Sequence, residues 1–121
     1  MKILLVIPRY SLTNKSNYDY TFTLGLAYIS SVIKQAGYEV DCLNLMHRDG
    51  KTEDLVKEAL DKKEYDILCT GHMGIGYAII EKIINAAKNY SSNTKIIIGG
   101  AMKHYGSLAA IFMIILISPI F

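Results

Sequence analysis

The hydrophobic and polar positions of the chain follow two alternating periods, which predict four strands separated by three helices. Short continuous apolar runs are typical of strands that are covered on both faces of a sheet. Between these runs, apolar residues recur every three or four positions, which is typical of an amphipathic helix packed on a core. The expected strands span residues 3–7, 40–45, 66–69 and 95–98, and the expected helices span residues 24–36, a segment from Thr52 and a segment from Tyr77.

Local signals at the helix ends support these boundaries. Gly37 follows the first helical stretch, at the position where glycine commonly ends a helix. Thr52 is expected to cap the second helix, and Glu53 and Asp54 in its first turn suit the positive end of the helix dipole. The last two helices carry apolar stripes that we expect to be buried: Leu55, Val56, Ala59 and Leu60 in the second, and Ile79, Ile80, Ile83, Ile84 and Ala87 in the third.

The order of these elements predicts the topology. Strict alternation of strand and helix is typical of an α/β fold with a parallel sheet and right-handed helical crossovers. With the first strand in the centre, the expected strand order is 2-1-3-4, or 2-1-3-4-5 with a fifth strand. This order corresponds to a flavodoxin-like (Rossmann-like) three-layer sandwich, which we assign to residues 1–107 as one domain.

The last 14 residues, 108–121, form an apolar tail that departs from this pattern. Residues 108–117 are ten consecutive apolar residues, and no Asp, Glu, Lys or Arg follows Lys103. A bilayer span needs about 20 such residues, so we expect no membrane span. Three interpretations stay open: a last helix with a partial fifth strand, self-association of the chain through residues 108–121, or a segment that is not native to this fold.

Composition narrows the classes of function. The 121 residues include 13 Lys and Arg against 11 Asp and Glu, a formal net charge of +2 without a basic stripe, so we expect no nucleic-acid partner. The 51% hydrophobic content excludes a disordered chain. Cys42 and Cys69 lie in apolar runs, and we expect buried thiols in a reducing compartment rather than a disulfide. The apolar run at the N-terminus is too short for a secretory signal, which predicts a cytoplasmic protein.

The predicted topology also indicates where a ligand binds. In an open parallel sheet, ligands bind beyond the carboxyl ends of the strands, at the point where the strand order reverses. That point lies between the first and third strands, and residues 8–23, 70–76 and 99–105 converge on it. The last two segments are rich in glycine, and helices beginning near Thr23 and Tyr77 would direct free N–H groups toward the same place.

Several familiar sites are missing from the sequence. Ile79 stands where the last glycine of a G-x-G-x-x-G loop would follow Gly74 and Gly76, and no phosphate-binding G-x-x-x-x-G-K-[ST] run exists. His72 and His104 fall near the expected site, but no nearby carboxylate or thiol completes a metal centre. We therefore expect no protein-ligated metal, no catalytic residue and a binding module rather than an enzyme.

Four short segments carry a resemblance to a known family. They are LGLAYI at residues 24–29, GYEV at 37–40, DI at 66–67 and IGG at 98–100. In this order and spacing they resemble the cobalamin-binding domain found before the radical S-adenosylmethionine domain in a large enzyme family. The likeness covers roughly residues 2–104. It implies a module that is truncated or isolated from such a protein, since the three-cysteine C-x-x-x-C-x-x-C cluster motif is absent.

The resemblance implies cobalamin as the cofactor and assigns the residues around it. Thr70-Gly71-His72 resembles the Ser-x-Leu element after the third strand of such domains, and Gly99-Gly100-Ala101 resembles their glycine pair after the fourth. The hydroxyl of Thr70 would then bond the nucleotide tail of cobalamin, and the two glycines would let the backbone pass close to it. The expected cofactor-binding residues are Pro8, Arg9, Tyr10, Leu24, Gly25, Thr70, Gly71, His72, Met73, Gly74, Gly99, Gly100 and Ala101.

The chain also departs from the pattern of that family. Domains that ligate cobalt through histidine carry D-x-H-x-x-G in the first strand-to-helix loop, where this chain has no histidine; members with a radical S-adenosylmethionine partner commonly lack it. His47 begins an H-x-x-G run after the second strand, but Leu45 occupies the Asp position, so we expect His47 to be a solvated loop residue. Thr23, Asn44 and Met102 stand where the family often has Pro, Asp and His.

Other classes of function stay open beside the resemblance. The chief alternative is a flavodoxin-like interaction module without a cofactor. A receiver module would need an acidic pocket after the first strand and a phosphorylatable Asp after the third, and Pro8-Arg9 and Thr70-Gly71-His72 supply neither. A small enzyme acting on a phosphorylated ligand would use the same glycine loops. A radical S-adenosylmethionine domain or partner chain is the expected protein partner.

Overall fold

The computed structural model describes residues 1–9, 24–71, 77–91, 93–99 and 115–117 of the chain. Its strands are β1 (Lys2–Ile7), β2 (Glu39–Asn44), β3 (Ile67–Gly71), β4 (Lys95–Gly99) and β5 (Ile115–Ile117). Its α-helices are α1 (Leu24–Gln35), α2 (Thr52–Lys62) and α3 (Tyr77–Tyr90), and a short 3-10 helix, η1 (Leu45–His47), follows β2.

The five strands form one sheet in the order β2-β1-β3-β4-β5. The first four are parallel, which confirms the predicted α/β fold and the 2-1-3-4 order. Ile3 of β1 is paired with Val40 of β2 on one side and with Ile67 of β3 on the other. Because the chain moves from β1 to β2 and then back to β3, the strand order reverses between β1 and β3.

Part of the apolar tail adds the fifth strand. β5 pairs antiparallel with β4, with Leu116 opposite Ile97. The other residues of the tail lie outside the described residues, as do residues 10–23, 72–76 and 100–107.

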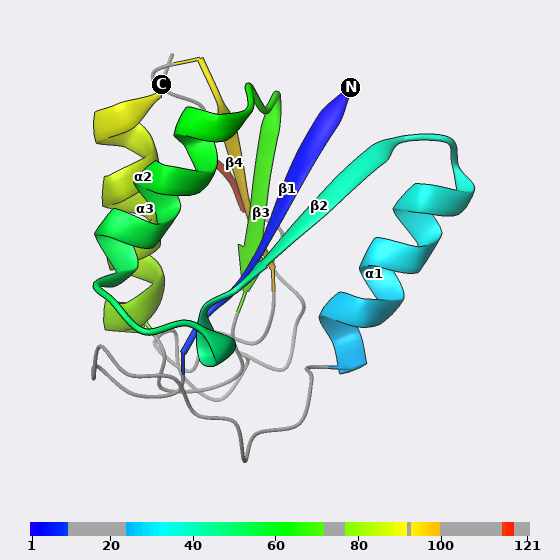
Figure 1. Ribbon diagram of the computed structural model, residues 1–121. Helices are drawn as coiled ribbons and strands as arrows, with labels where there is room; N and C mark the ends of the chain where they lie inside the picture. The colour runs from blue at the N-terminus through cyan, green and yellow to red at the C-terminus, as the bar shows by residue number, and fades with distance from the viewer. Residues whose placement is uncertain (10–23, 72–76, 92, 100–114, 118–121) are drawn as a thin grey trace.

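The helices lie on both sides of the sheet, with α1 on one side and α2 and α3 together on the other (Figure 1). Alternate residues of each strand point to opposite faces. The α2–α3 side holds the larger core, with Leu4, Val6, Leu68, Ile96 and Ile98 of the sheet against α2 and α3. The core on the α1 side contains Ile3, Leu5, Ile7, Leu26, Val40 and Met46.

Coverage of the α1 side is uneven across the described sheet. β1 is buried on both faces, whereas Ile67 and Cys69 of β3 and Ile97 of β4 are only half-buried on the α1 side. Their neighbours Leu68 and Ile96, which point to the α2–α3 side, are buried. The structure therefore leaves a half-buried apolar strip beside α1, formed by Ile67, Cys69 and Ile97.

Both cysteines are free thiols, but the prediction that they are buried is wrong for Cys42, which is exposed, and only partly right for Cys69, which is half-buried. A continuous apolar run suggested that both faces of each strand are covered. β2 is instead an edge strand of the sheet, and the α1 face of β3 is only partly covered, so neither thiol is enclosed on all sides.

The helix boundaries agree with the sequence except at the start of α2. Helices α1 and α3 begin at Leu24 and Tyr77 as expected, and Gly37 follows α1 with φ +92°. Thr52, predicted to be the cap of α2, is its first helical residue, and its side chain is buried. The prediction fails because the carbonyl of Lys51 already accepts the first helical bond, from Leu55 N at 3.0 Å.

Each predicted strand also differs from the observed one by a residue or two at one or both ends. Leu45, predicted to end the second strand, opens η1 instead, because the Asn44 side chain accepts a hydrogen bond from Met46 N at 3.0 Å and turns the chain. The third strand extends through Thr70 and Gly71, which were expected to lie in the following loop.

Candidate functional site

The described part of the predicted site gathers at the carboxyl edge of the sheet. Pro8 and Arg9 directly follow β1, Thr70 and Gly71 end β3, and Gly99 ends β4. Leu24 and Gly25 open α1. Strand pairing places Val6 opposite Thr70, and Gly71 opposite Gly99. The other predicted cofactor contacts, Tyr10, His72, Met73, Gly74, Gly100 and Ala101, lie outside the described residues, as does His104.

The two glycines that end β3 and β4 differ in their surroundings. A Cβ built on Gly71 would overlap the carbonyl oxygen of Gly99 and lie 2.9 Å from its carbonyl carbon. Among the described residues, a Cβ built on Gly99 would meet no atom within 4 Å. Gly71 is therefore required by the close approach of two strands, whereas Gly99 faces a space that no described residue fills.

That open space adjoins the half-buried strip beside α1. Gly99 continues the face of β4 that carries Ile97, and Gly71 continues the face of β3 that carries Cys69, since alternate residues share a face. Burial raises the pKa of the Cys69 thiol to about 11, so this thiol is uncharged at neutral pH. The strip that leads to Gly99 is thus apolar and neutral, which suits a flat apolar group better than an ion.

Thr70 lies on the opposite face of β3, next to the buried Leu68 of the α2–α3 core. Its hydroxyl donates to the carbonyl oxygen of Val6 at 2.9 Å, and the residue is 2% exposed. This hydrogen bond therefore joins β3 to β1. The Thr70 oxygen can still accept a hydrogen bond, and the role of Thr70 in binding a ligand stays a prediction.

Arg9 is the most deeply buried charged residue of the described site, at 2% exposure. Its Nε donates to Leu45 O at 2.9 Å, Nη1 donates to Gly50 O at 2.6 Å, and Nη2 donates to Arg48 O. Burial lowers the pKa of the guanidinium, and the charge of Asp49 acts in the opposite direction. Sequence reasoning placed Arg9 at this edge but could not show that backbone carbonyls occupy its donors.

The segment that Arg9 contacts is residues 45–50, which we call the second-strand loop. Its first two residues, Leu45 and Met46, are buried in different cores, on the α2–α3 side and on the α1 side. The loop therefore crosses the carboxyl end of the sheet. His47 is exposed, as predicted for a loop residue, with its Nδ1 3.4 Å from the Asn44 amide nitrogen.

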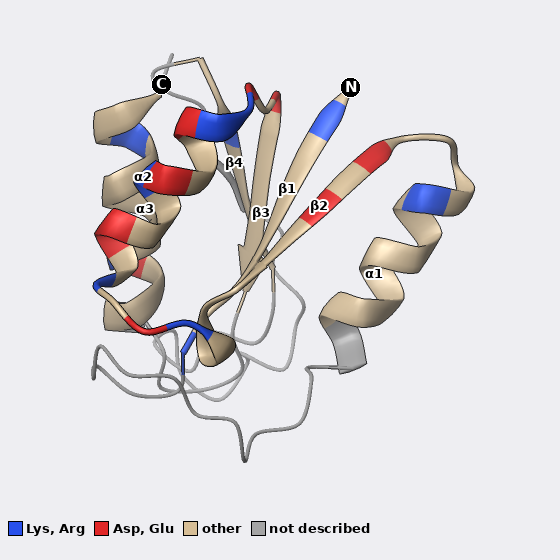
Figure 2. Ribbon diagram, viewed as in Figure 1, with Lys and Arg blue, Asp and Glu red and all other residues tan. Residues whose placement is uncertain are grey.

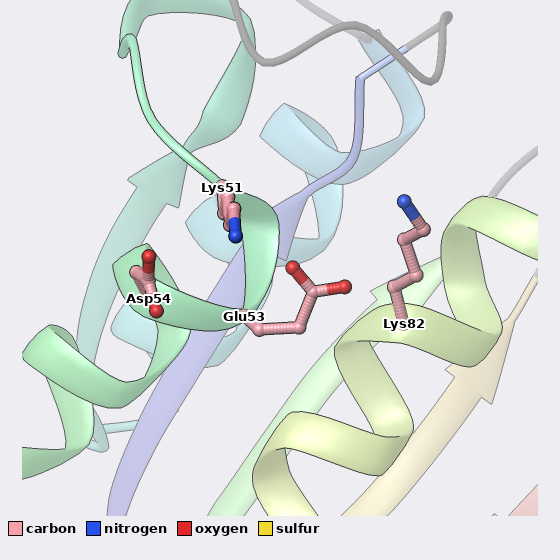
Figure 3. A pocket seen from close by; sticks show the side chains of 4 residues that line it. All are labelled: Lys51, Glu53, Asp54 and Lys82. Carbon is pink, nitrogen blue, oxygen red and sulfur yellow. The ribbon is translucent and has the colours of Figure 1, made fainter.

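A polar cavity of about 460 Å³ lies between the start of α2 and the side of α3, and none of its described lining residues is a predicted site residue. It is lined by Lys51, Glu53, Asp54 and Lys82. Figure 3 shows the Glu53 carboxylate between the two lysine side chains. Because two cations and two carboxylates offset each other and the cavity is wide open, it shows no preference for a charged ligand.

The described charges form no site of another class. Lys, Arg, Asp and Glu are interspersed along α2 and α3 (Figure 2). In the part of the chain that the structure describes, no group of three or more His, Cys, Asp or Glu could hold a metal ion. Nor does any described helix have the length and apolar content to cross a bilayer.

Comparison with known proteins identifies a family. The family model described as the B12 binding domain matches residues 12–112, a range that contains all described elements from α1 to β4. No curated protein matches the chain significantly, and neither does any solved structure.

Proposed function

Because the chain belongs to the B12-binding domain family, we propose that it holds cobalamin at the carboxyl edge of its sheet, with the nucleotide tail of the cofactor on the α1 side. The family match supports cobalamin as the cofactor. The observation that supports the place is the open space at Gly99, next to the half-buried strip of Ile67, Cys69 and Ile97. These residues fit the flat, uncharged base of the tail, which must pass close to the backbone, and not its charged phosphate.

Each described residue has a distinct part in this proposal. Gly99 leaves room for the tail, and Ile97 and Cys69 contact its apolar face. Gly71 lets β3 and β4 approach each other, so that the edge is narrow enough for both strands to reach one ligand. Any reaction chemistry would come from the cobalt centre of the bound cofactor, and the described residues would bind and orient it.

The protein partner is a second part of the proposal. Three residues on α1 are large, apolar and exposed: Tyr28 at 71%, Ile29 at 44% and Val32 at 47%. Residues three or four positions apart are neighbours on a helix surface, so Val32 lies beside both Tyr28 and Ile29. An exposed apolar patch of this kind supports contact with another protein surface. We propose a radical S-adenosylmethionine domain or chain there, in a cytoplasmic protein for which this chain is the cobalamin-binding part.

Spectral titration tests the cobalamin site. The purified chain is titrated with hydroxocobalamin and with methylcobalamin, and the visible spectrum and co-elution in gel filtration are followed. We expect saturable binding with a Kd on the order of 10 μM, which corresponds to about −7 kcal/mol. No spectral change and no co-elution at this concentration would contradict the proposal and favour the alternative of an interaction module without a cofactor.

A pair of variants locates the site. Gly99→Leu fills the open space and should weaken binding by about tenfold or more, a cost of about 1.4 kcal/mol. Lys95→Leu introduces the same side chain on the same face of β4, at the far end of the strand, and should bind like the wild type. Equal affinity of all three proteins would show that the tail does not lie beside Gly99.

A further inference from the structure

The Arg9 side chain donates hydrogen bonds to backbone carbonyls, although it lies at the edge of the sheet where a ligand is expected. Three of its nitrogens, Nε, Nη1 and Nη2, each donate to a different backbone carbonyl, of Leu45, Gly50 and Arg48. All three carbonyls belong to the second-strand loop. A guanidinium holds its donors in a rigid planar fork, so it can satisfy several acceptors at once, which an ammonium on a flexible chain cannot do in the same geometry.

The position of Arg9 makes these bonds a connection between two loops. Arg9 stands two residues after Ile7, the end of the central strand β1, where the chain leaves the sheet toward the first strand-to-helix loop. The second-strand loop follows β2, the neighbour of β1 on the sheet. The guanidinium therefore joins the chain after one strand to the chain after the next.

The second-strand loop ends in an uncommon backbone conformation and without a side-chain cap on the helix that follows. Gly50 has φ +118°, a conformation that L side chains rarely adopt, and it packs over the Leu55 side chain. Helix α2 begins directly after the loop, and its N-cap, Lys51, makes no side-chain capping bond. The contacts of Arg9 with Leu45 and Gly50 thus hold both ends of the loop against β1.

We propose that Arg9 is a positioning residue of the cobalamin site: it fixes the second-strand loop at the carboxyl edge and does not touch the cofactor. That the ligand is cobalamin rests on the proposed function. The Arg9 side chain is buried and its guanidinium is directed at the second-strand loop, so Arg9 fixes the position of this loop before the cofactor binds beside it. Asp49, in the same loop, supplies a negative charge that favours the buried cation.

Arg9→Lys and Arg9→Gln separate positioning from direct contact, with Lys62→Gln as the control. Lys62 lies in the last turn of α2, outside the second-strand loop, and its side chain is 70% exposed and pairs with Glu58. Both Arg9 variants should weaken hydroxocobalamin binding by about tenfold, and Lys62→Gln should leave it unchanged. Lysine keeps the charge but not the fork, so failure of Arg9→Lys to restore affinity is the result expected of positioning.

Cobinamide, which lacks the nucleotide tail and its phosphate, supplies the second readout. In this proposal the second-strand loop, held by Arg9, supports the corrin ring. Both Arg9 variants should therefore lose the same factor of affinity for cobinamide as for hydroxocobalamin. Wild-type affinity in Arg9→Lys, or a loss confined to hydroxocobalamin, would overturn the proposal and indicate a charge contact with the phosphate.

Hydrogen exchange of the ligand-free proteins tests the same inference without the cofactor. Amides of residues 44–52 should exchange about tenfold faster in Arg9→Lys than in the wild type, and at the wild-type rate in Lys62→Gln. Unchanged exchange in Arg9→Lys would overturn the role of Arg9. If the wild type binds no cobalamin while the exchange result holds, the proposed function fails and the loop connection stands.

Discussion

At the scale of single residues, two glycines at the carboxyl edge of the sheet matter because they carry no side chain. Gly71 and Gly99 are paired across β3 and β4, yet only a Cβ on Gly71 would overlap neighbouring backbone. Thr70, the residue before Gly71, carries a buried hydroxyl that joins β3 to the carbonyl of Val6 in β1. These neighbours therefore have different tolerances to substitution.

Gly71→Ala and Gly99→Ala should differ in stability although the chemical change is the same. The new methyl group at position 71 overlaps the Gly99 carbonyl, so β3 and β4 must separate, at a cost of about 1–3 kcal/mol. At position 99 the methyl group meets open space, and the stability should change by less than about 0.5 kcal/mol. Urea unfolding of both variants measures the difference; equal stabilities would contradict the close approach of the two strands.

Thr70→Val should destabilise the protein more than Thr70→Ser. Valine has the shape of threonine but removes the side-chain bond to the Val6 carbonyl, and the loss of such a hydrogen bond costs about 0.5–1.5 kcal/mol. Serine keeps the hydroxyl and loses only a methyl group. The midpoint of chemical unfolding decides the order, and a Thr70→Val protein as stable as the wild type would show that this bond adds nothing.

At the scale of elements, the exposed edge strand β2 is fastened by a cluster of polar side chains from the segment between α2 and β3. Lys63 Nζ bonds Asp41 Oδ2 at 2.9 Å and also contacts Glu39, and the Tyr65 hydroxyl donates to the same Asp41 oxygen at 2.7 Å. Hydrogen bonds from Lys63 and then Tyr65 lower the pKa of Asp41. Burial, and then the bond to Asp41, raise the pKa of Tyr65 to about 12.

These shifts predict how stability depends on pH. Because the pKa of Asp41 is lower in the folded state, its contribution is present above its unfolded pKa of about 4 and is lost as pH falls through the folded value. The contribution of Tyr65 is present below its unfolded value of 10.0 and is lost as pH rises toward about 12. Partial exposure and salt screening limit the contribution of Asp41 to about 1 kcal/mol or less.

Unfolding of the wild type and of Asp41→Asn across this range measures the effect. The stability difference between them should be present at neutral pH and disappear in acid. Asp61→Asn, which makes the same change at an exposed residue of α2 outside this cluster, serves as the control. A difference that persists unchanged below the lowered pKa of Asp41 would show that charge is not the cause.

At the scale of the whole molecule, the two faces of the sheet contribute unequally to stability. Ile96 and Ile97 are consecutive residues of β4, but Ile96 is 1% exposed in the α2–α3 core, whereas Ile97 is half-buried on the α1 side. Ile96→Ala should cost about 2–5 kcal/mol and Ile97→Ala less than half as much, since less apolar surface and a smaller cavity are involved. Thermal and urea unfolding compare the pair; an equal loss would mean that both faces are packed equally.

The tail adds a second property of the whole molecule. Since β5 pairs with the outer side of β4, removal of residues 108–121 would leave β4 as an unpaired edge. We expect the shortened protein to unfold at a lower temperature and to aggregate more readily than the full chain. Calorimetry and light scattering measure both effects, and an unchanged melting temperature and oligomer size would show that the tail is dispensable.

The sequence predicted the elements well because their signals are local. The apolar stripe from Ile79 to Ala87 shows which side of a helix is buried, and the continuous run from Ile3 to Ile7 shows that both faces of a strand are buried, without reference to the rest of the chain. Thr52 shows where such reasoning stops: the residue suits a cap, but the bond from Leu55 to the Lys51 carbonyl places it inside the helix. Part of the predicted site, including His72 and Gly100, lies outside the described residues.

The sequence by itself determined the order of strands and helices, and hence the parallel sheet and the point where its order reverses, because hydrophobic periodicity and chain order suffice for these. Only the tertiary structure decided that Arg9 donates to the second-strand loop, that Gly71 touches Gly99, that Cys42 is exposed and that β5 is antiparallel. The reason is physical: these features depend on distances between residues far apart in the chain, which sheet twist and helix packing set and which no local pattern of residues encodes.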